Sequence, residues 1–119
     1  MAARAVTRDR VVNVNRLQLV GRLGDPPVES ELPSGDVIAS FRVIVDRPAG
    51  HGSGQRVDTL DCTAWTSRVR KTVRGWQRGD LVEIEGAVRR RFFATPAGRA
   101  SRFDIEVSSA RRVRRAASA

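Results

Sequence analysis

The chain reads Asn15-Arg16-Leu17-Gln18-Leu19-Val20-Gly21-Arg22-Leu23-Gly24 near its beginning, and apolar and polar residues alternate along this stretch. A period of two places the leucines on one face and the polar side chains, Arg16, Gln18 and Arg22, on the other. The pattern predicts a β-strand with one buried face and one hydrated face. A small β-protein with arginines on its open surface is a candidate for binding a polyanion.

Four further runs alternate in the same way and are separated by turn-forming residues. Pro33-Ser34-Gly35 precedes the second run, and the glycine-rich loop Pro48–Arg56 follows it. Val28–Leu32 is interpreted as a short, bent continuation of the first strand. The expected strands are Val12–Leu23, Val37–Arg47, Val57–Thr66, Leu81–Phe93 and Ala100–Val107.

One short helix is predicted over Ser67–Arg78. Val69, Val73 and Trp76 are spaced at i, i+4 and i+7, which puts them on one apolar stripe. Either Thr66 or the first residue of the range can cap the helix, and Gly79 can close it in the left-handed conformation. The helix therefore packs on the core, with Trp76 as a core residue.

The order of elements is β-β-β-α-β-β, and most connections are short. We expect an all-β fold, a five-stranded barrel of the oligonucleotide/oligosaccharide-binding (OB) type, with the helix between strands three and four. Gly21 and Gly86 are expected at sites of close packing or strand bending. The expected organisation is a disordered arm at residues 1–11, one domain at 12–110 and a basic tail at 111–119.

Alternation also assigns residues to the core. Cys62, the sole cysteine, shares a face with apolar neighbours and is predicted to be packed inside, with no disulfide to form. Val88 and Phe103 are expected to point inward from the last two strands. Phe92 is expected to be a core or edge residue, whereas Phe93 should lie on the opposite, hydrated face.

The formal net charge is +9, and Lys71 is the one lysine among 22 basic residues. A GC-rich gene would explain the choice of arginine over lysine as well as function does, but it would not explain the excess of charge. That excess favours a polyanionic partner. A membrane surface is disfavoured because the charges follow strands and not an amphipathic helix.

Catalysis is not expected. His51 is the sole histidine, and no second histidine, paired cysteine motif or acidic metal-binding cluster accompanies it. The glycine loop around it lacks the Gly-Lys-Ser/Thr of a phosphate-binding loop. We therefore predict no enzyme activity, no cofactor and no metal. Met1–Arg10 faintly resembles a transit peptide, but its short length and its Asp9 favour a disordered arm.

Several segments together resemble the bacterial single-stranded DNA-binding protein (SSB) family, over about Asn13 to Val113. The resemblance rests on residues 15–24 quoted above and on the segments Leu32-Pro33-Ser34-Gly35, Ala39-Ser40-Phe41 and Arg78-Gly79-Asp80-Leu81-Val82-Glu83-Ile84-Glu85-Gly86. It implies a homo-oligomer of OB barrels, a tetramer or a dimer, that wraps single strands without sequence preference.

The resemblance also implies which aromatic residues stack on bases. Trp65 and Phe93 match two of the family's aromatic positions, whereas Thr59 and the stretch Pro48-Ala49 replace two others. The acidic C-terminal tip through which the family recruits other proteins has no counterpart in the basic run Arg111–Arg115. We therefore expect a divergent or accessory paralogue, without recruitment of replication proteins through such a tip.

A single strand exposes phosphates on one side and base faces on the other, so a non-specific binder needs cations beside flat rings. Trp65 and Phe93 are the predicted stacking residues. The predicted phosphate contacts are Arg16, Arg22, Arg42, Arg47, Arg56, Arg89 and Arg91. Because charge must supply much of the affinity, binding is expected to weaken strongly with salt.

The sequence thus favours single-stranded DNA binding in replication, recombination or repair, in the cytoplasm at the bacterial nucleoid. Two alternatives stay open. One is a protein-interaction adaptor on the same barrel, similar to the primosomal replication protein. The other is an RNA-binding OB module, because base stacking alone does not distinguish the sugars.

Overall fold

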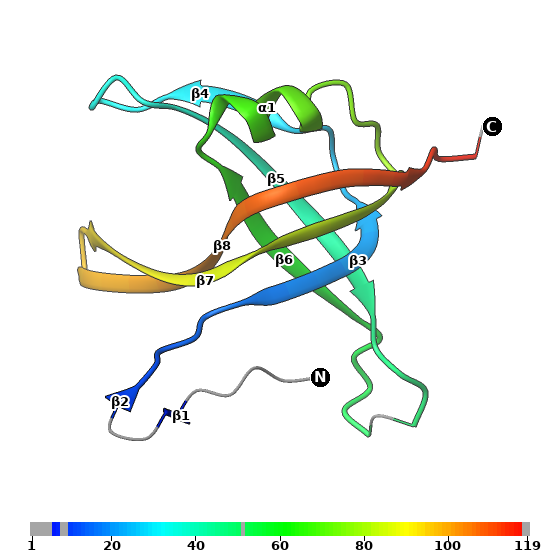
Figure 1. Ribbon diagram of the computed structural model, residues 1–119, viewed down its shortest axis with the longest axis horizontal. Helices are drawn as coiled ribbons and strands as arrows, with labels where there is room; N and C mark the ends of the chain where they lie inside the picture. Colours follow the sequence, from blue (N-terminus) through cyan, green and yellow to red (C-terminus); the bar gives the residue numbers. More distant parts are fainter. Residues whose placement is uncertain (1–5, 8–9, 51, 118–119) are drawn as a thin grey trace.

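The computed structural model describes residues 6–7, 10–50 and 52–117 (Figure 1). Its strands and its helix follow one another in the expected β-β-β-α-β-β order, with three short strands added. The elements are β1 (Val6–Thr7), β2 (Arg10–Val11), β3 (Leu17–Leu23), β4 (Val28–Glu31), β5 (Val37–Asp46), β6 (Val57–Ala64), α1 (Ser67–Val73), β7 (Leu81–Thr95) and β8 (Gly98–Arg114).

Five of these strands close into a barrel. The order of neighbours is β3-β7-β8-β6-β5, and β3 pairs back onto β5 at Arg22↔Ile44 and Leu23↔Val43. The pairings are antiparallel except for β6 with β8, which is parallel. Helix α1 stands between the third and fourth barrel strands, as predicted. The fold prediction is therefore confirmed, and β4 extends the sheet by pairing with β5.

The core lies inside the barrel and beneath α1. Leu23, Val43 and Ile84 are at most 1% exposed, and each such side chain contributes about 1.5–3 kcal/mol of burial free energy. The ring of Trp76 meets that of Phe41 edge to face, with centroids 5.7 Å apart and planes at 74°. The predicted alternation of the first strand is confirmed, because its leucines are turned toward this core.

The helix is shorter than predicted. Thr66 caps it, since its hydroxyl oxygen accepts a hydrogen bond from the Val69 backbone N–H at 3.2 Å. The helix ends at Val73, not at Arg78. Gly75, with φ of +92°, is the left-handed residue that follows the helix, so the prediction that Gly79 closes it was wrong. Trp76 reaches the core from the turn beyond the helix.

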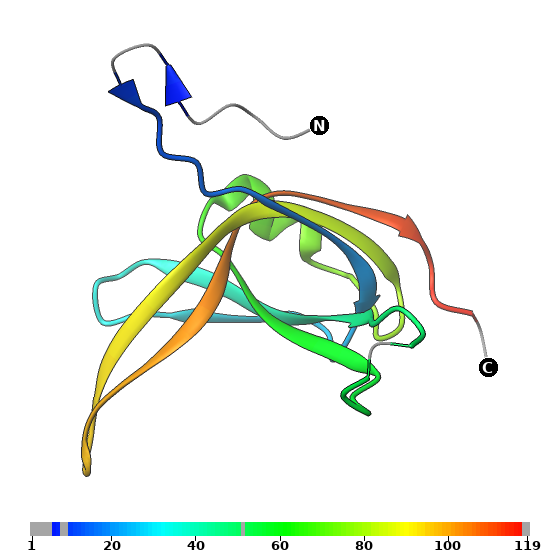
Figure 2. The same ribbon diagram turned by 90° about the horizontal axis from the view of Figure 1, so that it is seen from below.

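The β7–β8 hairpin is the longest element and continues past the barrel as a two-stranded ribbon (Figures 1 and 2). The register shifts at Leu81/Val82 and at Glu85/Gly86, and from Gly86 the pairing runs without a break to Thr95↔Gly98 at the tip. At the other end, β8 continues to Arg114. Part of the expected basic tail, residues 111–114, is therefore a paired strand, because β7 offers partners as far back as Leu81.

The predictions that Val88 and Phe103 are core residues were wrong, and of the two alternatives for Phe92, core or edge, the core is excluded for the same reason. Val88 is 40% exposed, Phe92 is 60% exposed and Phe103 is 65% exposed. All three lie on the ribbon beyond the rim of the barrel, where no other strand or helix covers them in the described part of the chain. Thr63, by contrast, points away from the core but is only 6% exposed, and its hydroxyl donates to the buried carboxylate of Asp104.

The predicted disordered arm, residues 1–11, lies partly outside the described residues; within it, β1 and β2 pair with each other. His51 also lies outside them. In the part of the chain that the structure describes, no helix has the length and apolar composition that a membrane crossing needs. Over the same residues, no group of three or more His, Cys, Asp or Glu side chains is placed to hold a metal ion.

Candidate nucleic-acid interface

One hydrated surface crosses β5, β6, β8 and β7 and carries several of the predicted site residues. It is formed by the side chains that these strands direct away from the core, and we call it the outer face. Its register is fixed by pairs such as Arg42↔Asp61 and Arg89↔Asp104. The outer face consists of Arg42, Asp61, Thr63, Trp65, Arg89, Arg91, Phe93, Arg102, Asp104 and Glu106.

Trp65 lies half-buried on this face, beneath an arginine. The Arg91 guanidinium carbon is 5.3 Å from the centroid of its ring. Arg91 Nε donates to Asp104 Oδ2 at 3.2 Å, and the Thr63 hydroxyl donates to Asp104 Oδ1 at 3.0 Å. Asp104 is only 2% exposed. This chain of contacts fixes Arg91 over the ring, so a base that stacks on Trp65 must share the ring with Arg91 or displace it.

Phe93 is 44% exposed and follows Arg91 at the next position on the same face of β7. The structure therefore places the two predicted stacking residues on one surface, where Arg91 lies over the ring of Trp65 and two residues before Phe93 on β7. A solvated ring of this kind is available to a ligand.

Most of the predicted phosphate-binding arginines already have a carboxylate partner. The shortest N···O distances are 3.0 Å for Arg22–Asp46, 2.9 Å for Arg42–Asp61, 2.8 Å for Arg47–Asp58, 2.8 Å for Arg89–Glu106 and 3.2 Å for Arg91–Asp104. Exposed ion pairs contribute only about 0–1 kcal/mol. A phosphate can therefore replace the carboxylate in the exposed pairs, whereas removing Arg91 from its pair would leave the Asp104 carboxylate, 2% exposed, without its arginine.

The remaining two arginines, Arg16 and Arg56, form no ion pair with any residue that the structure describes. Arg16 shares a hollow with Arg89 and Glu106 beside the start of β3. Arg56 lies at the mouth of the β5–β6 loop, where its carbonyl oxygen accepts from the Arg47 backbone N–H at 2.8 Å. The predicted contacts thus fall into separate groups on the barrel and do not form one continuous track.

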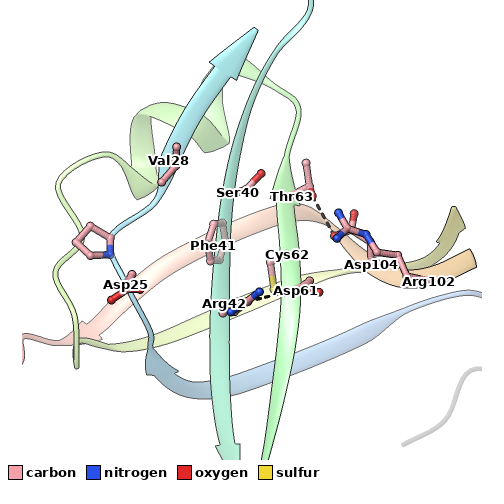
Figure 3. Close-up of a pocket in the computed structure, with 11 residues that line it drawn as sticks. Asp25, Val28, Ser40, Phe41, Arg42, Asp61, Cys62, Thr63, Arg102 and Asp104 are labelled. Atoms are coloured by element: carbon pink, nitrogen blue, oxygen red, sulfur yellow. Dashed lines mark hydrogen bonds and ion pairs between the residues drawn. The ribbon is translucent and has the colours of Figure 1, made fainter. Parts of the chain in front are cut away.

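A pocket of about 280 Å³ opens on the outer face between β4, β5, β6 and β8 (Figure 3). Its rim carries Arg42 with Asp61 on one side and Arg102 with Asp104 on the other. Arg102, which sequence reasoning did not select, has no carboxylate partner among the described residues. The pocket joins donors and acceptors, so it can contact the edges of a base as well as a phosphate.

Cys62 lies at the floor of that pocket and is 1% exposed. Burial raises the pKa of its thiol to about 12, and the neighbouring carboxylates of Asp104 and Asp61 act in the same direction. The thiol therefore stays protonated at neutral pH, and the prediction that Cys62 is a packing residue is confirmed.

Sequence reasoning missed a second set of candidate contacts on the ribbon. Arg90, Phe92 and Phe103 are exposed, and the Arg90 guanidinium carbon lies 5.2 Å and 5.5 Å from the two ring centroids. The length of the two alternating runs on either side of Pro96 and Gly98 could have revealed this set. Together these runs are longer than the strands that a barrel of this size needs, so their ends must extend beyond it. Residues of such an overhang have no core to face.

Comparisons with known proteins agree with this geometry. A sequence model described as the single-strand binding protein family matches residues 14–113. A single-stranded DNA-binding protein of Halalkalibacterium halodurans is 30% identical over 87 residues, which are 72% of this chain and 52% of that protein. Single-stranded DNA-binding protein 3 of Listeria innocua is 33% identical over 79 residues, 66% of this chain and 49% of that protein. The chain thus spans about half the length of these curated relatives.

Solved structures show the same fold. A Plasmodium falciparum SSB in complex with ssDNA superposes with a TM-score of 0.69 at 16% identity, covering 87% of this chain and 95% of that one. A mitochondrial single-stranded DNA-binding protein of S. cerevisiae gives a TM-score of 0.66 at 14% identity, over 87% and 98% of the two chains. These likenesses confirm the closed OB-type barrel.

Proposed function

The chain belongs to the single-strand binding protein family, and from that membership we propose that it binds single-stranded DNA without sequence preference. The family is one of binding proteins, so the prediction that the chain is not an enzyme is confirmed at the level of the family. The proposed setting is DNA replication, recombination or repair at the bacterial nucleoid in the cytoplasm.

One observation carries the proposal: Arg91 lies over Trp65 on the outer face, with the exposed ring of Phe93 next along the strand. A cation beside flat rings on a hydrated β-surface provides for both parts of a single strand, its phosphates and its unstacked bases. Neither ring reads base edges, so this arrangement supports binding that tolerates any sequence.

The energetics favour more than one barrel acting together. Two stacked bases contribute about 2–6 kcal/mol before ordering costs, whereas micromolar binding requires about 8 kcal/mol. The arginines with carboxylate partners contribute less than free cations would, because each pair must open first. We therefore propose that the chain acts as a homo-oligomer, a dimer or a tetramer, in which several barrels share one strand.

The test is a comparison of ligands of equal length. Fluorescence anisotropy with poly-dT, poly-U and duplex DNA should show the tightest binding for poly-dT. Equal binding of poly-U would favour the RNA-binding alternative, and no binding of any of them would favour a protein-interaction adaptor. Light scattering on the same samples measures the number of subunits.

The fluorescence of Trp65 can report directly whether DNA binds at the outer face. We expect dT oligomers to quench its fluorescence, and we expect Trp65→Ala to weaken binding by about 1–3 kcal/mol. Trp76 is 3% exposed and reports folding, so its emission is the internal control. A folded Trp65→Ala variant with unchanged affinity would remove this ring from the interface.

A further inference from the structure

The ribbon has a second face, opposite to the outer face, which we call the inner face. Cross-strand partners point to the same side of a sheet, and Arg90 pairs with Phe103 while Phe92 pairs with Ser101. This side continues the core-facing side of β7 and β8 beyond the rim. The inner face consists of Val88, Arg90, Phe92, Arg99, Ser101 and Phe103.

Rings and guanidinium groups alternate along the inner face in the order Phe103, Arg90, Phe92, Arg99. The distances from guanidinium carbon to ring centroid are 5.5 Å, 5.2 Å and 5.8 Å along this row. The Ser101 hydroxyl accepts from Arg90 Nη2 at 3.1 Å and helps to hold it between the two rings. Both kinds of group are planar, and both are surfaces on which nucleic-acid bases stack.

Charge separates the two faces of the ribbon. On the outer face, Arg89 and Arg91 are paired with Glu106 and Asp104, and Arg102 is the one ribbon arginine there without a carboxylate partner among the described residues. On the inner face, Arg90 and Arg99 have no carboxylate partner among the residues that the structure describes. The uncompensated positive charge of these two arginines therefore lies beside its most exposed rings, Phe92 at 60% and Phe103 at 65%.

The combination of exposed rings and arginines without carboxylate partners indicates which kind of ligand fits the inner face. Exposed apolar surface of this kind marks a contact site. A second copy of the chain that packed the same face against it would bring free arginines against free arginines, which electrostatic complementarity disfavours. A flexible polyanion with flat apolar faces complements both features, since arginine binds phosphate and the rings receive the bases.

We propose that the inner face is a second binding track for single-stranded DNA, so that one strand contacts the ribbon on both sides. The inference rests on the proposed function and extends it. A strand long enough to pass around the tip at Pro96 contacts Arg99, Phe92, Arg90 and Phe103 in turn. Short strands occupy the outer face alone.

The first test removes charge. The double variant Arg90→Gln/Arg99→Gln should lower the slope of log affinity against log salt for poly-dT by about 1.4, at about 0.7 per lost phosphate contact. Arg68→Gln/Lys71→Gln is the matched control, because both residues are exposed on α1 and form no ion pair in the described part of the chain. An inner-face variant whose slope equals that of this control would overturn the proposal.

The second test removes the rings. Phe92→Ala/Phe103→Ala should weaken binding of dT strands of about 30 nucleotides tenfold or more, with much less effect at about 8 nucleotides, within the site size of one OB barrel. Quenching of Trp65 by the short strand should stay as in the unmodified protein. Circular dichroism checks the fold, which two exposed side chains should not alter.

The outcomes separate the two proposals. An unmodified protein that neither binds poly-dT nor shows Trp65 quenching would refute both. Normal quenching together with unchanged long-strand binding by Phe92→Ala/Phe103→Ala would refute the inner track alone. A lower mass of that variant in light scattering, with unchanged DNA binding, would show instead that copies of the chain meet through this face.

Discussion

Gly21 and Gly86 are buried at points where strands of the barrel cross at close range. A Cβ at Gly21 would overlap the carbonyl oxygen of Ile44 on β5, and a Cβ at Gly86 would overlap that of Glu106 on β8. The obstacles are backbone atoms, which cannot rotate away as a side chain could. Both positions therefore serve strand packing, as their sequence context predicted.

Gly86→Ala should destabilise the fold by about 1–3 kcal/mol, because the methyl group forces β7 and β8 apart at their register shift. Thermal unfolding followed by circular dichroism measures the effect. Gly24→Ala is the matched control, since a Cβ there makes only ordinary contacts, 3.6 Å from Arg42. Equal unfolding midpoints for the two variants would contradict this reading of Gly86.

At the scale of elements, the turn at residues 77–80, which precedes β7, is held by hydrogen bonds to the end of β8 and to the residues that follow it. The Asp80 carboxylate is 1% exposed and accepts from the Gln77 backbone N–H at 2.8 Å, the Ala116 backbone N–H at 2.7 Å and Arg112 at 3.4 Å. Burial acts to raise the pKa of Asp80, but these hydrogen bonds together outweigh it and lower the pKa. The Arg78-Gly79-Asp80 motif thus has a structural role here.

Asp80→Asn should lower stability at neutral pH by about 1–3 kcal/mol, since an amide cannot accept all of these bonds. Because the pKa of Asp80 is lower in the folded state, its stabilisation is present above the unfolded pKa of about 3.9 and disappears as pH falls through the folded value. Urea unfolding at a series of pH values should show the difference from the unmodified protein shrinking below about pH 4.

The comparison needs an exposed carboxylate that has no ion pair in the described part of the chain, and Glu31 provides one. Glu31→Gln should leave the free energy of unfolding almost unchanged at every pH. A deficit for Asp80→Asn that stays constant from neutral pH to below the unfolded pKa would show that the buried charge is not what stabilises the turn.

At the scale of the whole molecule, a net charge of +9 is distributed unevenly between paired and free arginines. Much of the positive charge on the outer face is neutralised by carboxylates on adjacent strands, as in Arg42–Asp61 and Arg89–Glu106. The net charge therefore overstates what this surface offers to a phosphate. If the outer face binds phosphates as proposed, the carboxylates should influence the strength of binding as well as the arginines.

Removal of these carboxylates should strengthen binding. Asp61→Asn/Glu106→Gln frees Arg42 and Arg89, and the slope of log affinity against log salt for poly-dT should steepen by up to about 1.4. Glu31→Gln/Asp36→Asn changes the net charge equally without freeing an arginine. If both double variants shift affinity and slope to the same extent, general charge and not the release of these arginines governs binding.

The fold could be predicted from the sequence because its signals are local. Alternation fixed which side chains of Leu17–Leu23 face the core, and glycine marked the points of close approach. The type of site followed as well, since arginines and rings on a β-surface suit only a few ligands. Trp65 and Phe93 lie on the hydrated face that counting residues along their strands predicted, and their role in base stacking stays a prediction.

The sequence by itself determined most of the strands and the chemistry of the surface, because these depend on neighbours within a few residues, and the order of the elements predicted the barrel. The tertiary structure alone decided which face of Leu81–Thr95 is covered and which arginines are free. Alternation distinguishes two faces of a strand, but a partner from elsewhere in the chain decides which one is buried. Beyond the rim no such partner covers Phe92 and Phe103, and only folding brings Asp61 to Arg42.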